Sequence, residues 1–545
     1  MYADFETIIK PLQPDCVPSS SVLTSSLSSS STSNVAVHEP FSFGYYIKCN
    51  YNDSLSKYVS FRGKNASSEF LKNIREDLVY IFDNHLNKFT PMSPLTDSEN
   101  ASYISATRCH ICNDQLISDK VRDHCHLSGK YRGPAHSDCN LNYKIQKFIP
   151  IFFHNLSGYD SHLFIKELWC EKHPNDILQV IPATDEKYIS FSIKILRENT
   201  GTFKNKYLEL RFLDSFRFLS SSLENLASSL KEAEFAETKK AFQYSNVDLI
   251  LKKAIFPYEY LSSFEKLNES QLPSKEYFYS SISNSHISDE EYAHANNIWN
   301  RFNIKSLGEY SDIYLKIDVF LLTDIIEKFR NVCLSMYGLD PAHFYTLPGF
   351  SWSAMLKYTK VELELISDLE MIQFIKKGIR GGISYCSKRY AKANNKYMKE
   401  YDQNIPSSFL IYLDANNQYG WAMSQALPYG NFKWCTDSEM ENLSINNMDS
   451  DENVGYILEV DIEYPKELHD EHNDYPFCAE KMASPISCNN MAKLIPNLHN
   501  KSRYIIYHKN LIQSVKHGLK LKHIHRALKF NQSCWLKKYI ELNNR

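Results

Sequence analysis

Two carboxylate side chains near the start of the chain have a spacing that could hold a cation. The segment MYADFETIIK carries Asp4 and Glu6 on either side of Phe5. On a strand these two acids point to one face and Phe5 points to the other. Carboxylates placed side by side repel each other, and a cation between them removes the repulsion. The same pattern is common on ordinary exposed strands, so a cation site needs further ligands from elsewhere in the chain.

Two later patterns could supply these ligands. In HNLSGYD, Asn155 and Asp160 follow the apolar run FIPIFF and precede a predicted helix, where Asp160 could also serve as an ordinary helix cap. In YLKID, Tyr314 and Asp318 lie four residues apart, which places a phenol and a carboxylate on one face of a helix. Taken alone, such a pair is more often a surface hydrogen bond.

A block rich in cysteine and histidine separates the first acidic pattern from the second. Cys109-x2-Cys112 and His136-x2-Cys139 are two soft ligand pairs whose spacing is typical of a tetrahedral zinc site. Basic side chains crowd the same block and predict a local surface for phosphate groups. These basic residues are Lys120, Arg122, Lys130, Arg132, Lys144 and Lys147.

An aspartate also ends an apolar, strand-like run, LIYLDANNQYG. An acid at the tip of a buried strand is costly unless a charged group faces it, so Asp414 is predicted to hold a cation. Tyr419 follows five residues later. An aspartate that ends a strand at a turn is common by itself.

Composition limits the classes of protein that these patterns can belong to. The chain has 545 residues, 43% of them hydrophobic, which is enough for a large core and more than one domain. A net charge of -3 gives no general support for nucleic-acid binding, so any such surface must be local. No run approaches the roughly 20 apolar residues of a membrane helix. Thirteen cysteines without a secretion signal indicate reduced thiols and an intracellular protein, whose compartment, the nucleus included, the sequence does not specify.

Alternating strand-like and helix-like segments predict a mixed α/β fold. A serine-rich loop is expected at 19–34. Helices are expected at 68–87, 317–337 and 350–366. Strands are expected at the N-terminus, in FIPIFF, in YISFSIKIL and KYLELRFLD as a hairpin, and in FLIYLD and VGYILEVDIEY.

In their order, Asp-x-Glu, Asn-x3-Tyr-Asp and Tyr-x3-Asp resemble the three exonuclease motifs of family B DNA polymerases. The resemblance implies a ribonuclease H-like 3′–5′ exonuclease in which Asp4, Glu6, Asp160 and Asp318 hold two Mg²⁺ or Mn²⁺ ions. Tyr314 would then orient the attacking water. The residues implied to contact the single-stranded primer end are Asn155, Ser222 and Leu223, the last two within SLENL.

The cysteine–histidine block resembles the HNH, or ββα-metal, module of phage recombination endonuclease VII. That resemblance implies a structural Zn²⁺, His124 as a general base, and Asp123 and Asn140 as magnesium ligands. Cys125 and His126 remain alternative zinc ligands. A second interpretation is a zinc-held insertion that binds DNA and cuts nothing, because a zinc finger needs only its four ligands. An exonuclease interrupted in this way resembles the polymerases of Maverick/Polinton-type mobile elements.

The C-terminal half extends the polymerase resemblance. LDANNQYG resembles polymerase motif A, with Asp414 as a magnesium ligand and Tyr419 under the sugar of the incoming nucleotide, although Asn417, Gln418 and Gly420 depart from the usual pattern. GIRGGIS resembles the glycine motif between exonuclease and polymerase of protein-primed enzymes. Its residues, implied to contact the template, are Arg380, Gly381 and Gly382.

The later palm motifs, a second carboxylate and a lysine-bearing helix, are missing from this sequence. Asp449-Ser450-Asp451 lies in a polar run and is interpreted as a loop. We therefore expect a fragment of a protein-primed family B DNA polymerase, with DNA, deoxynucleotides and a terminal protein primer as partners and no membrane. The alternatives are a stand-alone metal-dependent nuclease and a non-catalytic DNA-binding remnant of a mobile element.

Four domains are expected from these motifs. They are the N-terminal portion of the exonuclease at 1–103, the zinc insertion at 104–147, the remaining portion of the exonuclease at 148–340, and a partial polymerase domain at 341–545 that contains a terminal-protein-region-like insertion at 436–500.

Overall fold

The computed structural model describes residues 1–11, 36–86, 90–143, 148–170, 173–184, 187–196, 207–384, 386–444, 448, 453–483 and 492–544. The serine-rich segment 19–34 and Asp449 to Asp451 lie outside these residues. The chain forms two compact units, Met1–Ser351 and Trp352–Arg545. Each is described by itself below.

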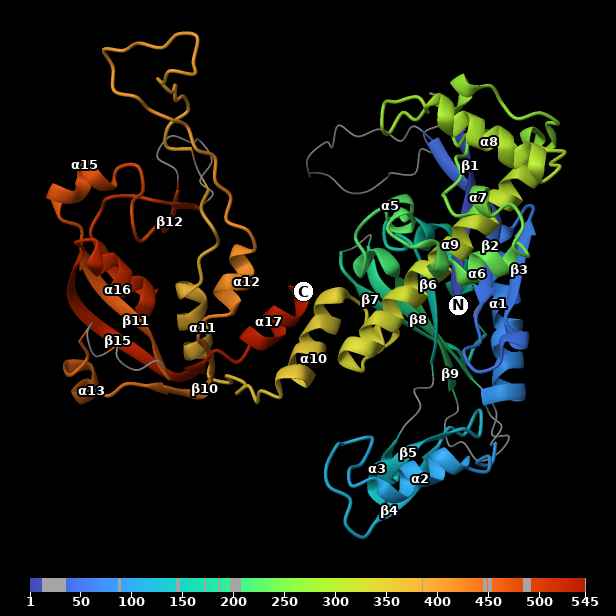
Figure 1. Ribbon diagram of the computed structural model, residues 1–545, viewed down its shortest axis with the longest axis horizontal. Coiled ribbons are helices and arrows are strands. Elements are labelled where there is room, and N and C mark those ends of the chain that lie inside the picture. The colour runs from blue at the N-terminus through green and yellow to red at the C-terminus, as the bar shows by residue number, and fades with distance from the viewer. Residues whose placement is uncertain are drawn as a thin grey trace, which may run out of the picture. The chain divides into compact units, whose positions relative to one another are not determined.

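The first unit contains a seven-stranded sheet (Figure 1). Its spatial order is β3 (Lys57–Arg62), β2 (Ala36–Ile47), β1 (Tyr2–Pro11), β6 (Phe148–Phe153), β9 (Tyr207–Asp214), β8 (Tyr188–Leu196) and β7 (Ile177–Pro182). Strands β3, β2 and β1 pair antiparallel, and β6 and β9 then continue parallel to β1. Three antiparallel strands followed by two parallel ones are the topology of a ribonuclease H-like sheet, so the predicted mixed α/β fold is confirmed. The predicted β8–β9 hairpin is also antiparallel as expected.

Alternation along the strands decides which helix each side chain meets. Phe5 on β1 and Phe43 on β2 join a core cluster with Phe70 of α1 (Ala66–Ile81) on one face of the sheet. On the other face Tyr46 of β2 packs against Phe320 of α9 (Leu307–Tyr337), with ring centroids 4.6 Å apart. Helix α9 therefore runs over the sheet face that carries the alternate residues of β1.

The ends of α9 follow from local chemistry. The Ser306 side chain accepts a hydrogen bond from the Glu309 backbone N–H at the N-terminus, and Gly338 adopts a left-handed conformation at the C-terminus. The helix therefore begins ten residues before the predicted start at 317. Helix α10 (Leu347–Thr359) ends before the predicted 366, because Lys360 adopts a left-handed conformation that no α-helix can contain.

The other helices of the first unit are short. They are α2 (Asp97–Ser105), α3 (Ser137–Asn142), α4 (Asp160–Cys170), α5 (Leu223–Ser228), α6 (Ala236–Ala241), α7 (Val247–Ile250) and α8 (Asp289–Arg301). Strands β4 (Lys120–His124) and β5 (Tyr131–His136) form a separate antiparallel pair that leads into α3. Residues 120–142 thus have the ββα order expected for the zinc insertion.

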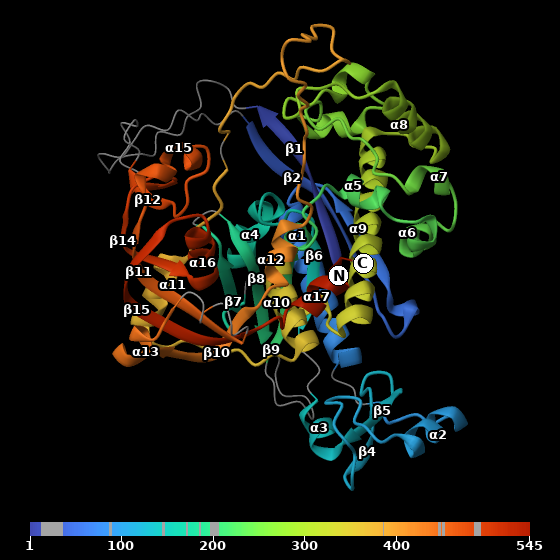
Figure 2. The same cartoon turned by 60° about the vertical axis from the view of Figure 1, so that its left-hand side comes forward.

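The second unit contains a four-stranded antiparallel sheet with α16 (His508–Lys516) packed on it (Figure 2). Its order is β10 (Leu427–Trp434), β15 (Lys520–Ser533), β11 (Val454–Glu463) and β14 (Lys501–Tyr507). Ile506 joins the core beneath Leu511 of α16, while Ile505 packs with Phe374 of α11 (Leu369–Gly378). The remaining elements are α12 (Gln418–Met423), α13 (Asp437–Glu441), α15 (His469–His472), α17 (Lys537–Asn543) and the β12 (Glu480–Ala483)–β13 (Ala492–Ile495) hairpin.

The predicted buried strand FLIYLD is wrong. Phe409–Asp414 pairs with no strand among the described residues, and Tyr412 is 95% exposed. A run of apolar residues forms a strand only where a neighbouring strand can pair with its backbone N–H and C=O groups. Here the described portion of the second unit offers none, so the apolar run stays extended and exposed.

Candidate functional site

Three acids from the first and third predicted motifs meet between β1 and α9. Because Ala3 and Phe5 point into the core, Asp4 and Glu6 point toward α9. Asp318 of α9 faces them, and one carboxylate oxygen from each of the three lies within 4.8 Å of the others. Gly44, opposite Asp4 on β2, permits this approach, since a Cβ there would lie 2.6 Å from the Tyr58 hydroxyl and 3.2 Å from Leu315 of α9.

Asp160, the fourth predicted acid, is the first residue of α4 and is 2% exposed. Its Oδ1 atom, like Oδ1 of Asp318, is buried without a hydrogen-bond partner in the described portion of the chain. Buried carboxylate oxygens without donors are costly. A bound divalent cation would satisfy both atoms, so the donor set fits the magnesium or manganese ions expected from the sequence.

Burial and mutual repulsion raise the pKa values of these acids. Burial, together with the Asp318 carboxylate, raises the pKa of Asp4 to about 7. Burial and then the Asp4 carboxylate also raise the pKa values of Glu6 and Asp160 well above their usual range. The cluster therefore favours protons or metal ions over bare negative charge.

Lys253 is a member of this cluster that the sequence motifs did not reveal. Its Nζ lies 2.7 Å from Oδ2 of Asp318. Burial opposes its charge, but Asp318, Asp4 and Glu6 outweigh burial and raise the pKa of Lys253. The residue lies in an irregular segment after α7, so only the fold brings it to α9. It occupies Oδ2 of Asp318 and leaves Oδ1 without a hydrogen-bond partner among the described residues.

Tyr314 lies one helical turn before Asp318 and is 1% exposed. Its hydroxyl is 2.6 Å from that of Tyr258, a second residue that sequence analysis missed. Burial, followed by the Asp318 carboxylate, raises the pKa of Tyr314 well above 10, so the phenol stays protonated. A protonated phenol beside the acids can donate a hydrogen bond to a water or a phosphate oxygen.

The turn between β6 and α4 presents Asn155. Its backbone N–H donates to Oδ1 of Asp214 at 3.0 Å, and the Ser157 N–H donates to Oδ2 of the same residue at 3.0 Å. Asn155 itself is left-handed, and a Cβ on Gly158 would lie 2.4 Å from the Asn155 amide oxygen. Asp214 and Gly158 therefore set the position of the Asn155 side chain.

A chain of hydroxyl contacts lies beside the acids. The Tyr159 hydroxyl is 2.6 Å from the Thr7 hydroxyl and 2.7 Å from Nδ1 of His38. Thr7 directly follows Glu6 and Tyr159 directly precedes Asp160 in the sequence, whereas His38 lies on β2. The exposed His38 imidazole thus holds the Tyr159 ring at the edge of the site. Tyr159 is the tyrosine of the Asn-x3-Tyr-Asp motif, whereas Thr7 and His38 belong to none of the sequence motifs.

The predicted primer contacts Ser222 and Leu223 begin helix α5. The Ser222 side chain caps the helix by accepting a hydrogen bond from the Asn225 N–H at 3.2 Å, and Leu223 is buried. His154, next to Asn155, hydrogen-bonds through Nε2 to the Ser221 carbonyl at 3.0 Å. This bond joins the segment that carries Ser222 to the turn that carries Asn155.

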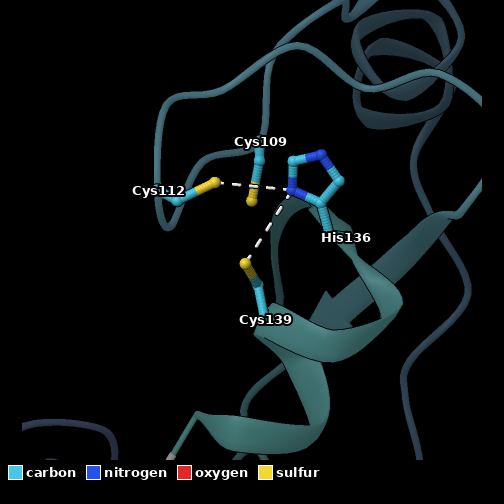
Figure 3. Close-up of side chains that lie close together, drawn as sticks. All are labelled: Cys109, Cys112, His136 and Cys139. Carbon is cyan, nitrogen blue, oxygen red and sulfur yellow. Dashed lines mark hydrogen bonds between the residues drawn. The ribbon is translucent and has the colours of Figure 1, made fainter.

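The four predicted zinc ligands converge (Figure 3). Cys109, Cys112, His136 and Cys139 each offer one ligand atom, and these atoms lie within 4.8 Å of one another. Nδ1 of His136 is 3.4 Å from Sγ of Cys112 and 3.8 Å from Sγ of Cys139. The alternative ligands Cys125 and His126 are not members of this group. Three thiols and an imidazole at this separation suit a tetrahedral transition metal.

The residues that the HNH resemblance implicates lie on β4 and α3. Asp123 is fully buried, and its carboxylate accepts hydrogen bonds from Arg132 Nε at 2.8 Å and Nη2 at 2.5 Å, and lies 2.8 Å from His110 Nε2. Burial, followed by the neighbouring His126, lowers the pKa of His124. Asn140 lies in α3, the helix that also carries Cys139.

Some of the basic side chains predicted to form a surface on this block instead bind groups within it. Lys120 donates from Nζ to the backbone carbonyls of Tyr103, Ile104 and Ala106 at the end of α2. Arg132 is bound to Asp123. Arg122 and Lys130 are exposed, and Lys144 and Lys147 lie outside the described residues.

The predicted polymerase residues do not form a closed site in the described portion of the second unit. Asp414 is exposed and joins no group of three potential metal ligands, and Tyr419 is 84% exposed. The Arg380 guanidinium donates to the Ile505 carbonyl at 2.6 Å and stacks on the Tyr504 ring. Gly381 and Gly382 adjoin open space, since a Cβ on either would meet no atom within 4 Å.

None of the helices in the described ranges has the length and apolar character needed to cross a membrane.

Comparison with known proteins assigns the family. Residues 139–545 match the family described as DNA polymerase type B, organellar and viral. No curated protein matches the chain. Matching solved structures include Phi29 DNA polymerase in an orthorhombic crystal form (12% identity, TM-score 0.41), in a ternary complex with primer-template DNA and incoming nucleotides (13%, 0.44), and with single-stranded DNA (12%, 0.41). Each match covers 99% of this chain and 62% of the other, so this chain spans less than two thirds of their length.

The family match includes the turn that carries Asn155, the acids Asp160 and Asp318, and Asp414, and it covers well over half of the chain. The polymerase resemblance of the sequence is thereby confirmed at the level of the family. The chain belongs to the type B DNA polymerases of the organellar and viral family.

Proposed function

We propose that the chain belongs to a protein-primed, DNA-directed DNA polymerase of replication, and that its first unit is a 3′–5′ exonuclease that removes nucleotides from a primer end. The observation that supports this most directly is the convergence of Asp4, Glu6 and Asp318, with Asp160 close enough for the Asp4 carboxylate to raise its pKa. These acids come from three distant segments, and bringing them together away from water has a cost that bound cations would offset.

In this proposal Asp4, Glu6, Asp160 and Asp318 hold Mg²⁺ or Mn²⁺, which would supply water activation and stabilise the leaving oxygen. Lys253 fixes the orientation of Asp318 through the 2.7 Å contact. Two groups of residues are proposed to act on the primer end. Tyr314, paired with Tyr258, donates a hydrogen bond toward the scissile phosphate or the water. Asn155, Ser222 and Leu223 bind the unpaired strand.

The second unit is proposed to contribute the beginning of the palm. Asp414 would bind magnesium and Tyr419 would contact the incoming deoxynucleotide, with Arg380, Gly381 and Gly382 near the template. A terminal protein primer would contact 436–500. The four-domain division at 103, 147 and 340 and an intracellular place of action belong to the same proposal. The described cysteines are free thiols, which agrees with a reducing compartment.

A second candidate function is a metal-dependent exonuclease without synthesis. It is favoured by the contrast between the two units, because the acids of the first unit converge whereas Asp414 is exposed and joins no described metal group. The two functions predict the same degradation activity and differ in primer extension.

One experiment tests both. The full chain is incubated with Mg²⁺ or Mn²⁺ and a 5′-labelled primer, either single-stranded or annealed to a template with deoxynucleotides. We expect stepwise 3′ degradation that is lost in Glu6→Ala and Asp318→Ala chains. Asp312→Asn, on the same helix but outside the cluster, should retain it. Degradation unchanged in Glu6→Ala would refute the exonuclease, and extension by the wild-type chain would favour the polymerase over the second candidate.

A further inference from the structure

Residues 90–143 bury very few apolar side chains. In this segment the buried side chains are those of Cys109, Asp123 and Ala135, and only the last is a hydrocarbon. A unit of this size without a hydrophobic core needs another source of stability, such as a metal. Two groups of contacts hold this segment together, and the family match, which begins at residue 139, covers only one of the residues in them.

The first group is the cysteine–histidine site. The Ile111 N–H donates to Sγ of Cys109 at 3.4 Å, and the Asp114 N–H donates to Sγ of Cys112 at 3.5 Å. Nε2 of His136 lies 3.1 Å from the Gln115 carbonyl, so Nε2 carries the proton and Nδ1 is left to bind a metal. Four protein ligands leave no open position, which is the arrangement of a structural rather than a catalytic zinc site.

The second group is centred on Asp123. Its carboxylate joins three sections of the segment, since Arg132 lies on β5, Asp123 on β4, and His110 between the two cysteines of the first ligand pair. The backbone N–H of His110 also donates to the Pro134 carbonyl at 2.8 Å. Asp123 therefore sets the position of Cys109 and Cys112 relative to the hairpin that leads to His136.

We propose that residues 90–143 form a structural module closed by one Zn²⁺ and by the Asp123–Arg132–His110 contacts, and that Asp123 is a structural acceptor rather than a ligand for a hydrolytic cation. Both oxygens of Asp123 are engaged by a guanidinium and an imidazole, so a magnesium ion would have to break an ion pair whose carboxylate is fully buried. This assigns Asp123 to folding and leaves nucleic-acid hydrolysis to the cluster of Asp4, Glu6, Asp160 and Asp318.

The metal is tested on the full chain by elemental analysis and by replacing zinc with Co²⁺. We expect about one zinc per chain and the absorption bands of tetrahedral Co²⁺–thiolate, both lost in Cys112→Ser and retained in Cys386→Ser, an exposed cysteine outside the site. Release of zinc to a coloured chelator is expected to be about tenfold faster in Asp123→Asn, as for other residues that position metal ligands. Zinc release that is unchanged in Asp123→Asn would overturn the structural role of Asp123.

The hydrolytic alternative is tested on duplex DNA with Mg²⁺ or Mn²⁺ in a Glu6→Ala background, which removes the proposed exonuclease. We expect no nicking, with or without His124→Ala. Nicking that persists in Glu6→Ala and disappears in His124→Ala and in Asp123→Asn, while zinc is retained, would overturn the proposal. The exonuclease is assayed separately on single-stranded 3′ ends, so failure of one idea is distinguishable from failure of the other.

Discussion

Lys253 offers a sharp test of how the carboxylate cluster works. Replacing it by methionine keeps a chain of similar length but removes the ammonium group that lies 2.7 Å from Asp318. At an effective dielectric constant of about 20, a contact of this length is worth at most roughly 6 kcal/mol. Asp318 is 2% exposed but the Lys253 side chain is 30% exposed, so solvent reduces this figure, and loss of one partner should cost about 3 kcal/mol.

If that cost fell entirely on the transition state, the rate would drop roughly 100-fold. Bound magnesium ions replace some of the lost positive charge, so we expect a fall of about 10- to 100-fold in kcat for single-stranded 3′ degradation. Lys253 also opposes the rise in the pKa of Asp4, which is about 7. Its loss raises that pKa further, so the acid limb of the pH–rate profile should move to higher pH, and more Mg²⁺ should be needed for half-maximal rate.

The measurement is single-turnover degradation of a labelled oligonucleotide over a range of pH and Mg²⁺ concentration. Lys252→Met is the matched control, because Lys252 is adjacent in sequence and exposed. A Lys253→Met chain that keeps the wild-type kcat, pH profile and magnesium dependence would refute the view that Lys253 orients Asp318.

Three further predictions follow from neighbouring contacts. Gly158→Ala should reduce exonuclease kcat at least about tenfold, because its Cβ would lie 2.4 Å from the Asn155 amide oxygen and displace that side chain. His38→Ala should raise KM for single-stranded oligonucleotides several-fold with a smaller change in kcat, because it frees the Tyr159 ring at the edge of the site. The metal-free chain should be less stable at pH 8 than at pH 5, and Mg²⁺ should raise Tm more at pH 8 than at pH 6, measured by differential scanning fluorimetry.

The sign of the last prediction follows from Asp4. Its pKa in the folded chain, about 7, is above the usual value of about 4, so its stabilising effect is complete below pH 4 and is lost as pH rises through 7. Mg²⁺ binds the ionised form and restores stability. A magnesium effect that is equal at both pH values would contradict this account. Gly349→Ala is the control for Gly158→Ala, because a Cβ on Gly349 would meet only the Thr346 hydroxyl, at 3.6 Å. Val37→Ala is the control for His38→Ala, because Val37 is exposed beside His38 on β2.

Local spacing was sufficient to predict the features of this protein that depend on backbone periodicity. A strand period of two places Asp4 and Glu6 on one face, and a helical turn places Tyr314 above Asp318. The strands FIPIFF and VGYILEVDIEY, the hairpin of β8 and β9 and the zinc ligand pairs were predicted for the same reason, because each depends on residues that are close in sequence.

Other features were decided by contacts between distant segments. Lys253 and Tyr258 reach α9 from an irregular segment, and His38 contacts Tyr159 from β2. No local sequence pattern marks Lys253, Tyr258 or His38 as members of the site. Asp123 has the spacing of a metal ligand, yet Arg132 and His110 occupy its oxygens. Leu410 to Leu413 is a continuous apolar run like that of a buried strand, but it stays exposed, because backbone hydrogen bonds and burial require a partner strand that local sequence cannot supply. Periodicity tells which way a side chain points, whereas only the folded chain determines what it meets there.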